Sequence, residues 1–428
     1  MNPPFPVLLA DTTRWSEAAR LAIALSEAGC AVSSICPARG HPLFKIRGLR
    51  QAFVYSPLRP LDSLAAAIKK VSPAIIIPCD DRAVGHLHEL HASARLQGPS
   101  GRGVADTIER SLGPPESYPI VSDRYELLQA AREEDIPVPA TRRLTTVDDL
   151  AKWQAGITGP CVLKVDGTSG GYGIRIAHNA DEARRSFNRL TRLLGTPQVL
   201  KRLVVNRDPF WLRPWWHRSK PTVVAQSYIH GRPANCAVVC REGRVLAGIA
   251  VEVVCTRGPT EPARVVRVVD HPAMMLVAQR IARRLHLSGF FGLDFIIETV
   301  TGAAYLIEMN PRITPLCHLR LGRCRDMVGA LIEELSEKPV PETPPVTRND
   351  LIAYFPQAWS VQNEFFQSSF QDVPSDEPEL VQELLNPWPD RTLLFRLFSY
   401  FYGHQGQSKQ CSFTETFAPS STPGQELR

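Results

Sequence analysis

The chain has 428 residues, of which 44% are hydrophobic, and a formal net charge of +6 at pH 7. This length and composition favour two or three globular domains. No apolar run approaches the roughly 20 residues that span a bilayer, the first residues lack the basic region of a secretory signal, and the ten cysteines include no Cys-x-x-Cys pair. We therefore expect a cytoplasmic protein with reduced cysteines.

Alternating strand and helix patterns open the chain. Residues 6–10, 31–36 and 71–78 are apolar and predict strands, and helical spacing of apolar residues lies between the first two. Strands that alternate with helices favour a parallel sheet. We therefore expect an α/β domain over residues 1–115.

Two acidic residues, Asp80 and Asp81, follow the third of these strands. Ligands of α/β sheets tend to bind beyond the carboxyl ends of the strands, but helix capping explains these residues equally well. The first strand-to-helix turn, residues 11–15, contains no glycine. This argues against a dinucleotide-binding domain.

A lysine and a glycine-rich stretch mark the next region. Lys164 lies on an apolar strand, and four glycines, together with Thr168 and Ser169, follow within ten positions. A lysine beside bare backbone N–H groups suits phosphate binding, because glycine lets the loop approach closely. The stretch matches neither the P-loop nor the dinucleotide fingerprint, and an ordinary glycine turn is the alternative. The candidate residues are Lys164, Ser169, Gly170, Gly171 and Gly173.

Residues 196–222 combine basic and aromatic side chains. They contain six lysines and arginines against one aspartate, with Trp211, Trp215 and Trp216 interleaved. This composition is compatible with a nucleic acid, a membrane surface, an anionic substrate or a lid over a nucleotide, and equally with a solvated insertion whose tryptophans pack back on the domain. A membrane- or nucleic-acid-associated protein is therefore a second rival. We do not expect DNA as a partner, and membrane contact is the less favoured interpretation.

The most informative pattern lies between Asp294 and Arg312. Two alternating strands are joined by a short turn near Thr301, which predicts a hairpin with Asp294 opposite Glu308. Glu308 and Asn310 are two residues apart, so their side chains leave the same face of the strand. Two carboxylates and an amide oxygen suit Mg²⁺. Arg312, just beyond the strand, is placed to steady negative charge.

Four segments in this order resemble the ATP-grasp superfamily, especially its carbamoyl-phosphate-synthase-like branch. Asp294 with residues 308–312 resembles the metal-binding end of that family. Residues 162–174 are similar to its lysine strand and glycine-rich loop, and residues 223–231 to its adenine hinge. Residues 122–125 resemble the segment from which a lysine or arginine reaches the phosphates.

The resemblance covers roughly residues 1–340 and implies an ATP-grasp fold, α/β followed by α+β. A small lobe is expected at 116–222 and a large lobe at 223–340, followed by a C-terminal appendage at 346–402 and a disordered tail at 403–428. Within the appendage, residues 390–402 are amphipathic, which favours a docking helix over a membrane-bound one.

The implied cofactors are ATP and Mg²⁺ or Mn²⁺, and the implied activity is that of a carboxylate–amine ligase. A carboxylate would take the γ-phosphate of ATP, and a nucleophile, most often an amine, would displace phosphate to form an amide. The implied roles are catalysis by Arg312 and Lys164, metal binding by Asp294, Glu308 and Asn310, and ATP binding by Arg124, Lys164, Ser169, Gly170, Gly171, Gly173, Gln226, Ser227, Tyr228 and Ile229.

Other features leave alternatives open. Many relatives carry a glutamate for the ribose where this chain has Ala234, with Asn235 next, so a nucleotide-binding protein without turnover is the main rival. Arg267, His318 and Arg320 are candidates for the substrate pocket or, equally, surface ion pairs and a core-edge histidine. A homodimer is also left open.

Overall fold

The computed structural model describes residues 5–38, 40–165, 173–191, 222–256, 258, 260–360 and 364–387. The basic insertion (apart from its last residue), the amphipathic stretch at 390–402, the tail and the loop residues Ser169, Gly170 and Gly171 lie outside these ranges. In the described part of the chain, no helix combines the length and hydrophobicity needed to cross a bilayer.

The N-terminal domain contains the predicted parallel sheet, with strand order β3-β2-β1-β4. Along β1, Val7 and Leu9 pack on the side of α1, whereas Leu8 and Ala10 pack against α2, α3 and α4. Strands covered on both faces are apolar throughout, which explains their continuous hydrophobic runs. The elements are β1 (Pro6–Ala10), α1 (Ser16–Glu27), β2 (Ala31–Cys36), η1 (Pro42–Lys45), β3 (Gln51–Val54), α2 (Pro60–Val71), β4 (Ile75–Pro78), α3 (Asp81–Leu96) and α4 (Pro99–Leu112).

A short helical segment leads into a small antiparallel sheet, with strand order β5-β8-β6-β7. Helices α7 and α8 cover this sheet through one hydrophobic cluster. Strand β8 belongs to it, so the small sheet extends beyond the expected boundary at residue 222. The elements are η2 (Pro115–Ser117), α5 (Tyr118–Val121), α6 (Arg124–Glu133), β5 (Thr141–Leu144), α7 (Val147–Gln154), β6 (Cys161–Val165), β7 (Ile174–Ala177), α8 (Ala180–Thr191) and β8 (Val223–Ser227).

The large sheet has seven strands in the order β13-β12-β9-β10-β11-β14-β15, antiparallel except for the last pair. Helices α6 and α11 pack on one face, and α1 of the N-terminal domain with α12 packs on the other. The elements are β9 (Gly231–Arg241), β10 (Arg244–Thr256), β11 (Ala263–Val269), α11 (Pro272–Leu285), β12 (Gly289–Glu298), β13 (Ala304–Asn310), η3 (Arg323–Arg325) and α12 (Met327–Ser336).

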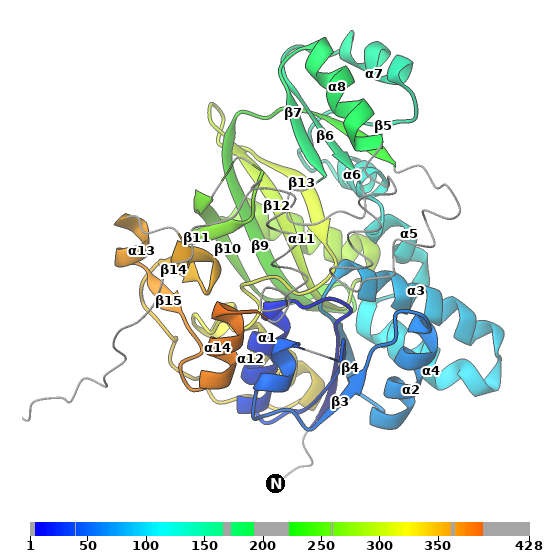
Figure 1. Cartoon of the computed structure of the whole chain (residues 1–428), viewed down its shortest axis with the longest axis vertical. Coiled ribbons are helices and arrows are strands. Elements are labelled where there is room, and N and C mark those ends of the chain that lie inside the picture. Colours follow the sequence, from blue (N-terminus) through cyan, green and yellow to red (C-terminus); the bar gives the residue numbers. More distant parts are fainter. Residues whose placement is uncertain are drawn as a thin grey trace, which may run out of the picture.

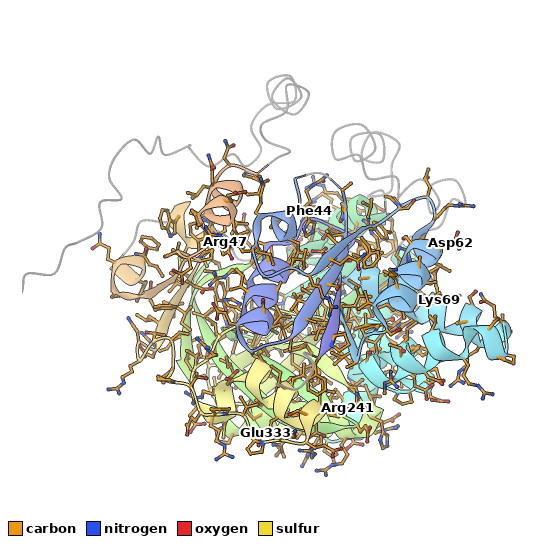
Figure 2. All side chains as sticks on the ribbon, turned by 90° about the horizontal axis from the view of Figure 1, so that it is seen from below. Phe44, Arg47, Asp62, Lys69, Arg241 and Glu333 are labelled. Carbon is orange, nitrogen blue, oxygen red and sulfur yellow. The ribbon has the colours of Figure 1, made fainter. Side chains whose placement is uncertain are left out.

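Residues beyond 346 extend this sheet and return to the N-terminal domain. They form β14 (Leu351–Tyr354), η4 (Gln357–Ser360), α13 (Glu364–Ser368), β15 (Phe370–Asp372) and α14 (Pro378–Leu385). Helix α14 lies beside η1, which contains Phe44, and near Arg47 (Figure 2), whose backbone N–H donates to Glu377. The C-terminal segment therefore contacts both the large sheet and the N-terminal domain.

The arrangement places the edge strand of the large sheet, β13, next to the small lobe. In Figure 1 the small lobe projects from the end of the molecule near β12 and β13, and the N-terminal domain lies at the opposite end of the large sheet. The predicted order of domains is observed: a parallel α/β sheet comes first, and two mainly antiparallel sheets follow. Strand β13 is the edge strand that faces the small lobe.

Candidate functional site

The β12–β13 hairpin has the register that the sequence predicts. Asp294 pairs with Glu308, and Gly292 pairs with Asn310. The amide nitrogen of Asn310 donates to Asp294 Oδ2 at 3.1 Å. All three side chains therefore gather on one face of the hairpin.

The hairpin also contains an irregularity that the sequence did not reveal. Asp294 faces Glu308 and the next residue, Phe295, faces Leu306, so Ile307 is an extra residue without an opposite partner. Such bulges are common next to active sites, because they redirect groups that would otherwise pair in the ladder. The carbonyl oxygen of Ile307 accepts hydrogen bonds from Lys164 Nζ at 3.5 Å and from Gln226 Nε2 at 3.3 Å.

These two contacts join the lobes. Lys164 lies on β6 and Gln226 on β8 of the small sheet, whereas Ile307 belongs to the large sheet. Both side chains are almost fully buried, at 4% and 2% exposure. A buried ammonium group needs negative partners nearby, and here the partners are the carboxylates of the hairpin.

Arg124, at the start of α6, bonds directly to the hairpin. Its guanidinium group donates to Glu308 Oε1 at 2.5 Å. Burial alone would raise the pKa of Glu308, but the charges of Arg124 and Lys164 outweigh burial and hold this pKa below its usual value. Glu308 is therefore ionised at neutral pH.

Asp294 has the opposite electrostatic balance. Burial raises its pKa most, the charge of Glu308 adds to this effect, and the hydrogen bond from Asn310 opposes it. The resulting pKa is about 6. The two carboxyl groups thus have pKa values displaced in opposite directions, which is a common property of functional sites.

The donor set fits a hard divalent cation. Among the described residues there is no group of three or more His, Cys, Asp or Glu side chains that could hold a metal ion. The candidate set is two carboxylates and one amide oxygen, which suits Mg²⁺, since this ion keeps several positions for water and substrate phosphates. The residues fit a nucleotide-bound Mg²⁺ better than a metal held by the protein alone.

The charge of Asp294 predicts a pH dependence of metal binding. A cation competes with the proton, so affinity for Mn²⁺ should weaken as the pH falls through about 6, the pKa of Asp294. The measurement is an electron paramagnetic resonance titration of Mn²⁺, in the presence of ADP, between about pH 5 and about pH 8. In Asp294→Asn this dependence should disappear; its persistence would assign the effect to another group.

Arg312 is fixed by four contacts, two of which come from the N-terminal domain. Its Nε donates to Asp81 Oδ1 at 2.9 Å, Nη2 donates to Asn310 Oδ1 at 3.1 Å, and Nη1 donates to the carbonyl of Ile313 at 3.1 Å. The guanidinium carbon lies 5.2 Å from the centre of the Trp15 ring. The sequence offered Asp81 only as a helix cap or a ligand contact; here it holds Arg312 in place.

The hinge candidates are described, and two of their backbone groups are already used. The N–H groups of Ser227 and Tyr228 donate to the carbonyls of Ala140 and Pro160, at 2.9 and 3.1 Å. The N–H of Ile229 has no partner among the residues that the structure describes. Gly173, the one described member of the predicted glycine loop, accepts from the N–H of Val165 at 3.0 Å.

The three candidates for the substrate pocket lie in different places. Arg267 is 45% exposed, pairs with Asp350 and occupies β11. Two strands, β9 and β10, lie between β11 and β12, so three inter-strand spacings, roughly 14 Å, separate them. Across the sheet, Arg267 is aligned with Glu252, Ala234 and Phe295. Phe295 is the neighbour of Asp294 along β12, and neighbouring residues of a strand point to opposite faces. Arg267 therefore points to the face opposite that of Asp294.

His318 and Arg320 follow Arg312 on a loop. Arg320 forms an isolated backbone bridge with Asp326, and its carbonyl accepts from the N–H of Val346. His318 bonds to Asp372, a residue of the C-terminal segment. The structure brings neither residue into the contacts that surround the hairpin.

One residue beside the hairpin was only guessed at in the sequence. Asn235 lies on β9 directly opposite Asp294 and is half-buried. Its side chain has no hydrogen-bond partner among the described residues. The sequence of β9 could have indicated this residue, because Asn235 is a polar side chain among mostly apolar ones on that strand.

Comparisons with known proteins address the family and the fold. Residues 121–315 match the ATP-grasp domain family. The large chain of carbamoyl phosphate synthase from Methanothermobacter thermautotrophicus is 22% identical over 269 residues, which are 60% of this chain and 22% of that protein. The chain thus spans about a fifth of the length of this curated relative.

Three solved structures share the fold. N5-carboxyaminoimidazole synthetase from Staphylococcus aureus, complexed with ADP, has a TM-score of 0.57 and 13% identity, with 80% of each chain covered. The L-amino acid ligase of Bacillus licheniformis has a TM-score of 0.56 and 12% identity, covering 80% of this chain and 77% of that one. The biotin carboxylase domain of Hydrogenobacter thermophilus 2-oxoglutarate carboxylase, with MgADP, ADP and bicarbonate, has a TM-score of 0.56 and 18% identity, covering 80% and 72%. At these identities the likeness establishes the fold.

Proposed function

Taking the chain as an ATP-grasp domain protein, we propose that it is an ATP-dependent ligase that activates a carboxylate as an acyl phosphate and joins it to an amine. The observation that carries this proposal is the convergence on one hairpin. Asp294, Glu308 and Asn310 supply three oxygen donors, and Lys164, Arg124 and Arg312 supply three cations from separate segments. Such an arrangement suits phosphoryl transfer, in which positioning and charge neutralisation do most of the catalysis.

Each residue has a distinct role in this proposal. Asp294, Glu308 and Asn310 would hold Mg²⁺, which supplies charge neutralisation of the transferring phosphoryl group. Lys164 and Arg124 bind the phosphates. Arg312, held rigid by Asp81, keeps donors free on both terminal nitrogens for the acyl phosphate, because one N–H of each is used in the contacts above.

A screen of ADP release tests the proposal. Purified protein with ATP and Mg²⁺ is offered single carboxylates and then pairs of amino acids, and ADP is detected by a coupled assay. We expect release that depends on a carboxylate and increases with an amine. Binding of nucleotide without ADP release, with every pair tested, would support the alternative that the protein binds nucleotide but does not turn it over. Ala234, at the position where many relatives carry a glutamate for the ribose, favours this alternative.

The bond between Arg124 and Glu308 leads to a separate prediction. Since the arginine occupies a metal ligand, Arg124→Ala should tighten the binding of Mn²⁺ in the absence of nucleotide, and Arg124→Lys should fall between it and the wild type. Electron paramagnetic resonance titration of free Mn²⁺ measures this. Arg132→Ala, an exposed change on the same helix, is the control. An unchanged affinity for Mn²⁺ in Arg124→Ala would show that Arg124 does not compete with the metal for Glu308.

Whether the protein forms the homodimer that the sequence left open is a question for solution measurements. Light scattering coupled to size exclusion measures the mass in solution directly, against the 47.5 kDa of one chain.

A further inference from the structure

A cavity of about 820 Å³ lies where α3 and α4 meet the large sheet. Its walls come from the ends of α3, α4 and α11, from the turn between β9 and β10, and from residues 113–117, which we call the linker because they lead from α4 to α5. Ser288, at the near end of β12, lines the cavity, and six residues of extended strand, about 20 Å, separate it from Asp294. The cavity is therefore separate from the candidate site at the hairpin.

Backbone contacts hold the walls of this cavity together. The N–H of Ser288 donates to the carbonyl of Leu112 at 3.2 Å, and the hydroxyl of Ser288 accepts from the N–H of Glu242 at 3.0 Å. Gly113 has a φ of +107°, and a Cβ added there would lie 2.7 Å from the carbonyl oxygen of His286. The linker thus lies directly against the loop before β12, at a distance that requires glycine.

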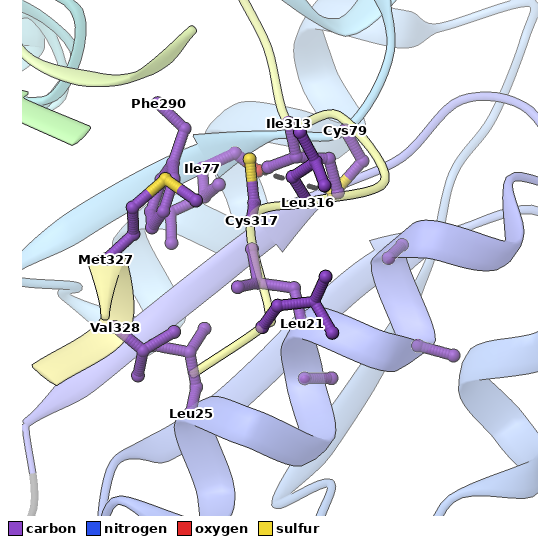
Figure 3. Packing of buried hydrophobic residues seen from close by; sticks show 14 of the residues in the cluster. Leu21, Leu25, Ile77, Cys79, Phe290, Ile313, Leu316, Cys317, Met327 and Val328 are labelled. Atoms are coloured by element: carbon purple, nitrogen blue, oxygen red, sulfur yellow. Dashed lines mark hydrogen bonds between the residues drawn. The ribbon is translucent and has the colours of Figure 1, made fainter. Parts of the chain in front are cut away.

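The start of β12 is also anchored to the core. Phe290, two residues after Ser288, packs with Ile77 of β4 and Met327 of α12 (Figure 3). The N-terminal domain and the large sheet are therefore joined beside the cavity. Its shape is built into the fold, as is usual for sites that bind small molecules.

The cavity is lined by charges of both signs, three arginines and four acidic residues. Most of these charges are already paired. Arg95 lies 3.5 Å from Asp106 and 2.7 Å from Glu109. Arg284 and Glu242 pair with residues outside the lining. Within the described part of the chain, these four acidic side chains do not form a group that could hold a metal ion.

Arg110 and Glu116 are the two charges that remain. Neither has an ion-pair partner among the residues that the structure describes, and the guanidinium group of Arg110 bonds there only to the hydroxyl of Thr107, at 3.4 Å. One guanidinium and one carboxylate around the same cavity suit a ligand that has both a carboxylate and an ammonium group. A purely anionic ligand such as phosphate would be repelled by Glu116.

Tyr118 adds a buried hydroxyl beside these charges. The residue is 7% exposed, and its hydroxyl has no hydrogen-bond partner in the described ranges. Its ring stacks on His88, with the ring centres 3.9 Å apart. Burial raises the pKa of Tyr118, and the charges of Glu109 and Glu116 raise it further, so the neutral hydroxyl lies near two residues of the lining. A buried hydroxyl without a partner is unfavourable, and a polar group in the cavity would relieve this.

We propose that this cavity binds a short peptide as a zwitterion, with the carboxylate on Arg110 and the ammonium group on Glu116. The volume lies within the range of small-molecule pockets, roughly 300–1,000 Å³, and is ample for two or three residues. Tyr118 supplies a neutral hydrogen-bonding group beside them. The inference does not depend on the ligase function proposed above, because no residue of the hairpin takes part.

Calorimetric titration of the full chain with L-alanyl-L-alanine tests the charge requirement. The titration is made in the presence of MgADP and repeated with the N-acetylated and the C-amidated forms of the same dipeptide. Each blocked form lacks one of the two charges and should bind about 10-fold more weakly or worse, because a charge-assisted hydrogen bond is lost. The free dipeptide should bind at a single site.

Variants assign the binding to the cavity. Arg110→Gln and Glu116→Gln should each weaken the affinity for the dipeptide by about 10-fold or more, and Tyr118→Phe should weaken it to a smaller extent. The matched controls are Arg102→Gln, an exposed change on α4, and Glu89→Gln, an exposed change on α3. Both controls should bind the dipeptide like the wild type.

Four outcomes would overturn the inference. The dipeptide might show no saturable binding up to about 10 mM, or the blocked forms might bind as tightly as the free one. Affinity might be retained in both Arg110→Gln and Glu116→Gln, or the two controls might lose it equally. Glu308→Gln separates this site from the hairpin: it should bind the dipeptide like the wild type, and a loss there with retention in Arg110→Gln would place the dipeptide at the hairpin instead.

Discussion

Glu308→Gln is expected to reduce carboxylate-dependent ADP release by about 100-fold or more, because in the proposed role this carboxylate would hold the Mg²⁺ that supplies several kcal/mol of charge stabilisation around the phosphates. The substitution keeps the size of the side chain and its hydrogen-bonding ability toward Arg124, but removes the negative charge opposite Asp294. Steady-state rates of ADP release at saturating ATP measure the effect, and a thermal melt checks that the fold is kept.

Glu298→Gln provides a matched control on the same hairpin. Glu298 ends β12, and among the described residues its side chain bonds only to its own turn, at the N–H groups of Val300 and Thr301 and the hydroxyl of Thr301. This variant should keep nearly full activity. Equal losses in both variants would mean that the hairpin fold, and not the metal site, limits the rate, and full activity in Glu308→Gln would remove the metal assignment.

Lys164→Ala should weaken the binding of ATP by about 10-fold or more, because a buried ammonium group is lost from the proposed phosphate site. Lys164→Arg should restore affinity only in part, since a planar guanidinium group does not replace a compact charge in a tight site. Isothermal titration with ATP in the presence of Mg²⁺ gives the affinities.

Lys152→Ala is the corresponding control, because Lys152 is exposed on α7 of the same lobe. It should bind ATP like the wild type. If Lys164→Ala also retained wild-type affinity, the phosphates would have to bind elsewhere, and the hydrogen bond from Lys164 to Ile307 would be a structural contact between the lobes.

The parts of the molecule that the sequence predicted are those set by local patterns. The pairing of Asp294 with Glu308 follows from a strand period of two and a short turn. The parallel N-terminal sheet follows from apolar runs that alternate with helices. The ATP-grasp relationship was also recognisable, because its four segments keep their order along the chain.

The parts that escaped prediction depend on contacts between distant residues. Asp81 and Arg312 are 231 positions apart, and Asp372 is 352 positions from Arg20. No periodicity connects such pairs, since they form only when the domains pack. The bulge at Ile307 could not be predicted from the sequence either, because it changes the pairing register of the strands and not the pattern of residue types.

The boundary between the two lobes also depends on contacts that the sequence pattern does not reveal. The hydrophobic pattern of β8 predicts a strand but not the sheet it joins, and its pairing with β5 and β6 assigns it to the small lobe. Likewise, α6 follows the N-terminal domain in sequence but packs Leu127 and Leu128 into the cluster of the large sheet. A sequence pattern identifies an element, whereas its partner is decided by packing.

The central claim, that a carboxylate is activated as an acyl phosphate, is tested most directly by isotope transfer. The carboxylate identified by ADP release is labelled with ¹⁸O in both oxygens, and the inorganic phosphate formed in the complete reaction is analysed by mass spectrometry. We predict phosphate with one ¹⁸O atom, because the oxygen that attacks ATP leaves with the phosphate when the amide forms. Phosphate without label, alongside amide formation, would contradict the proposed mechanism.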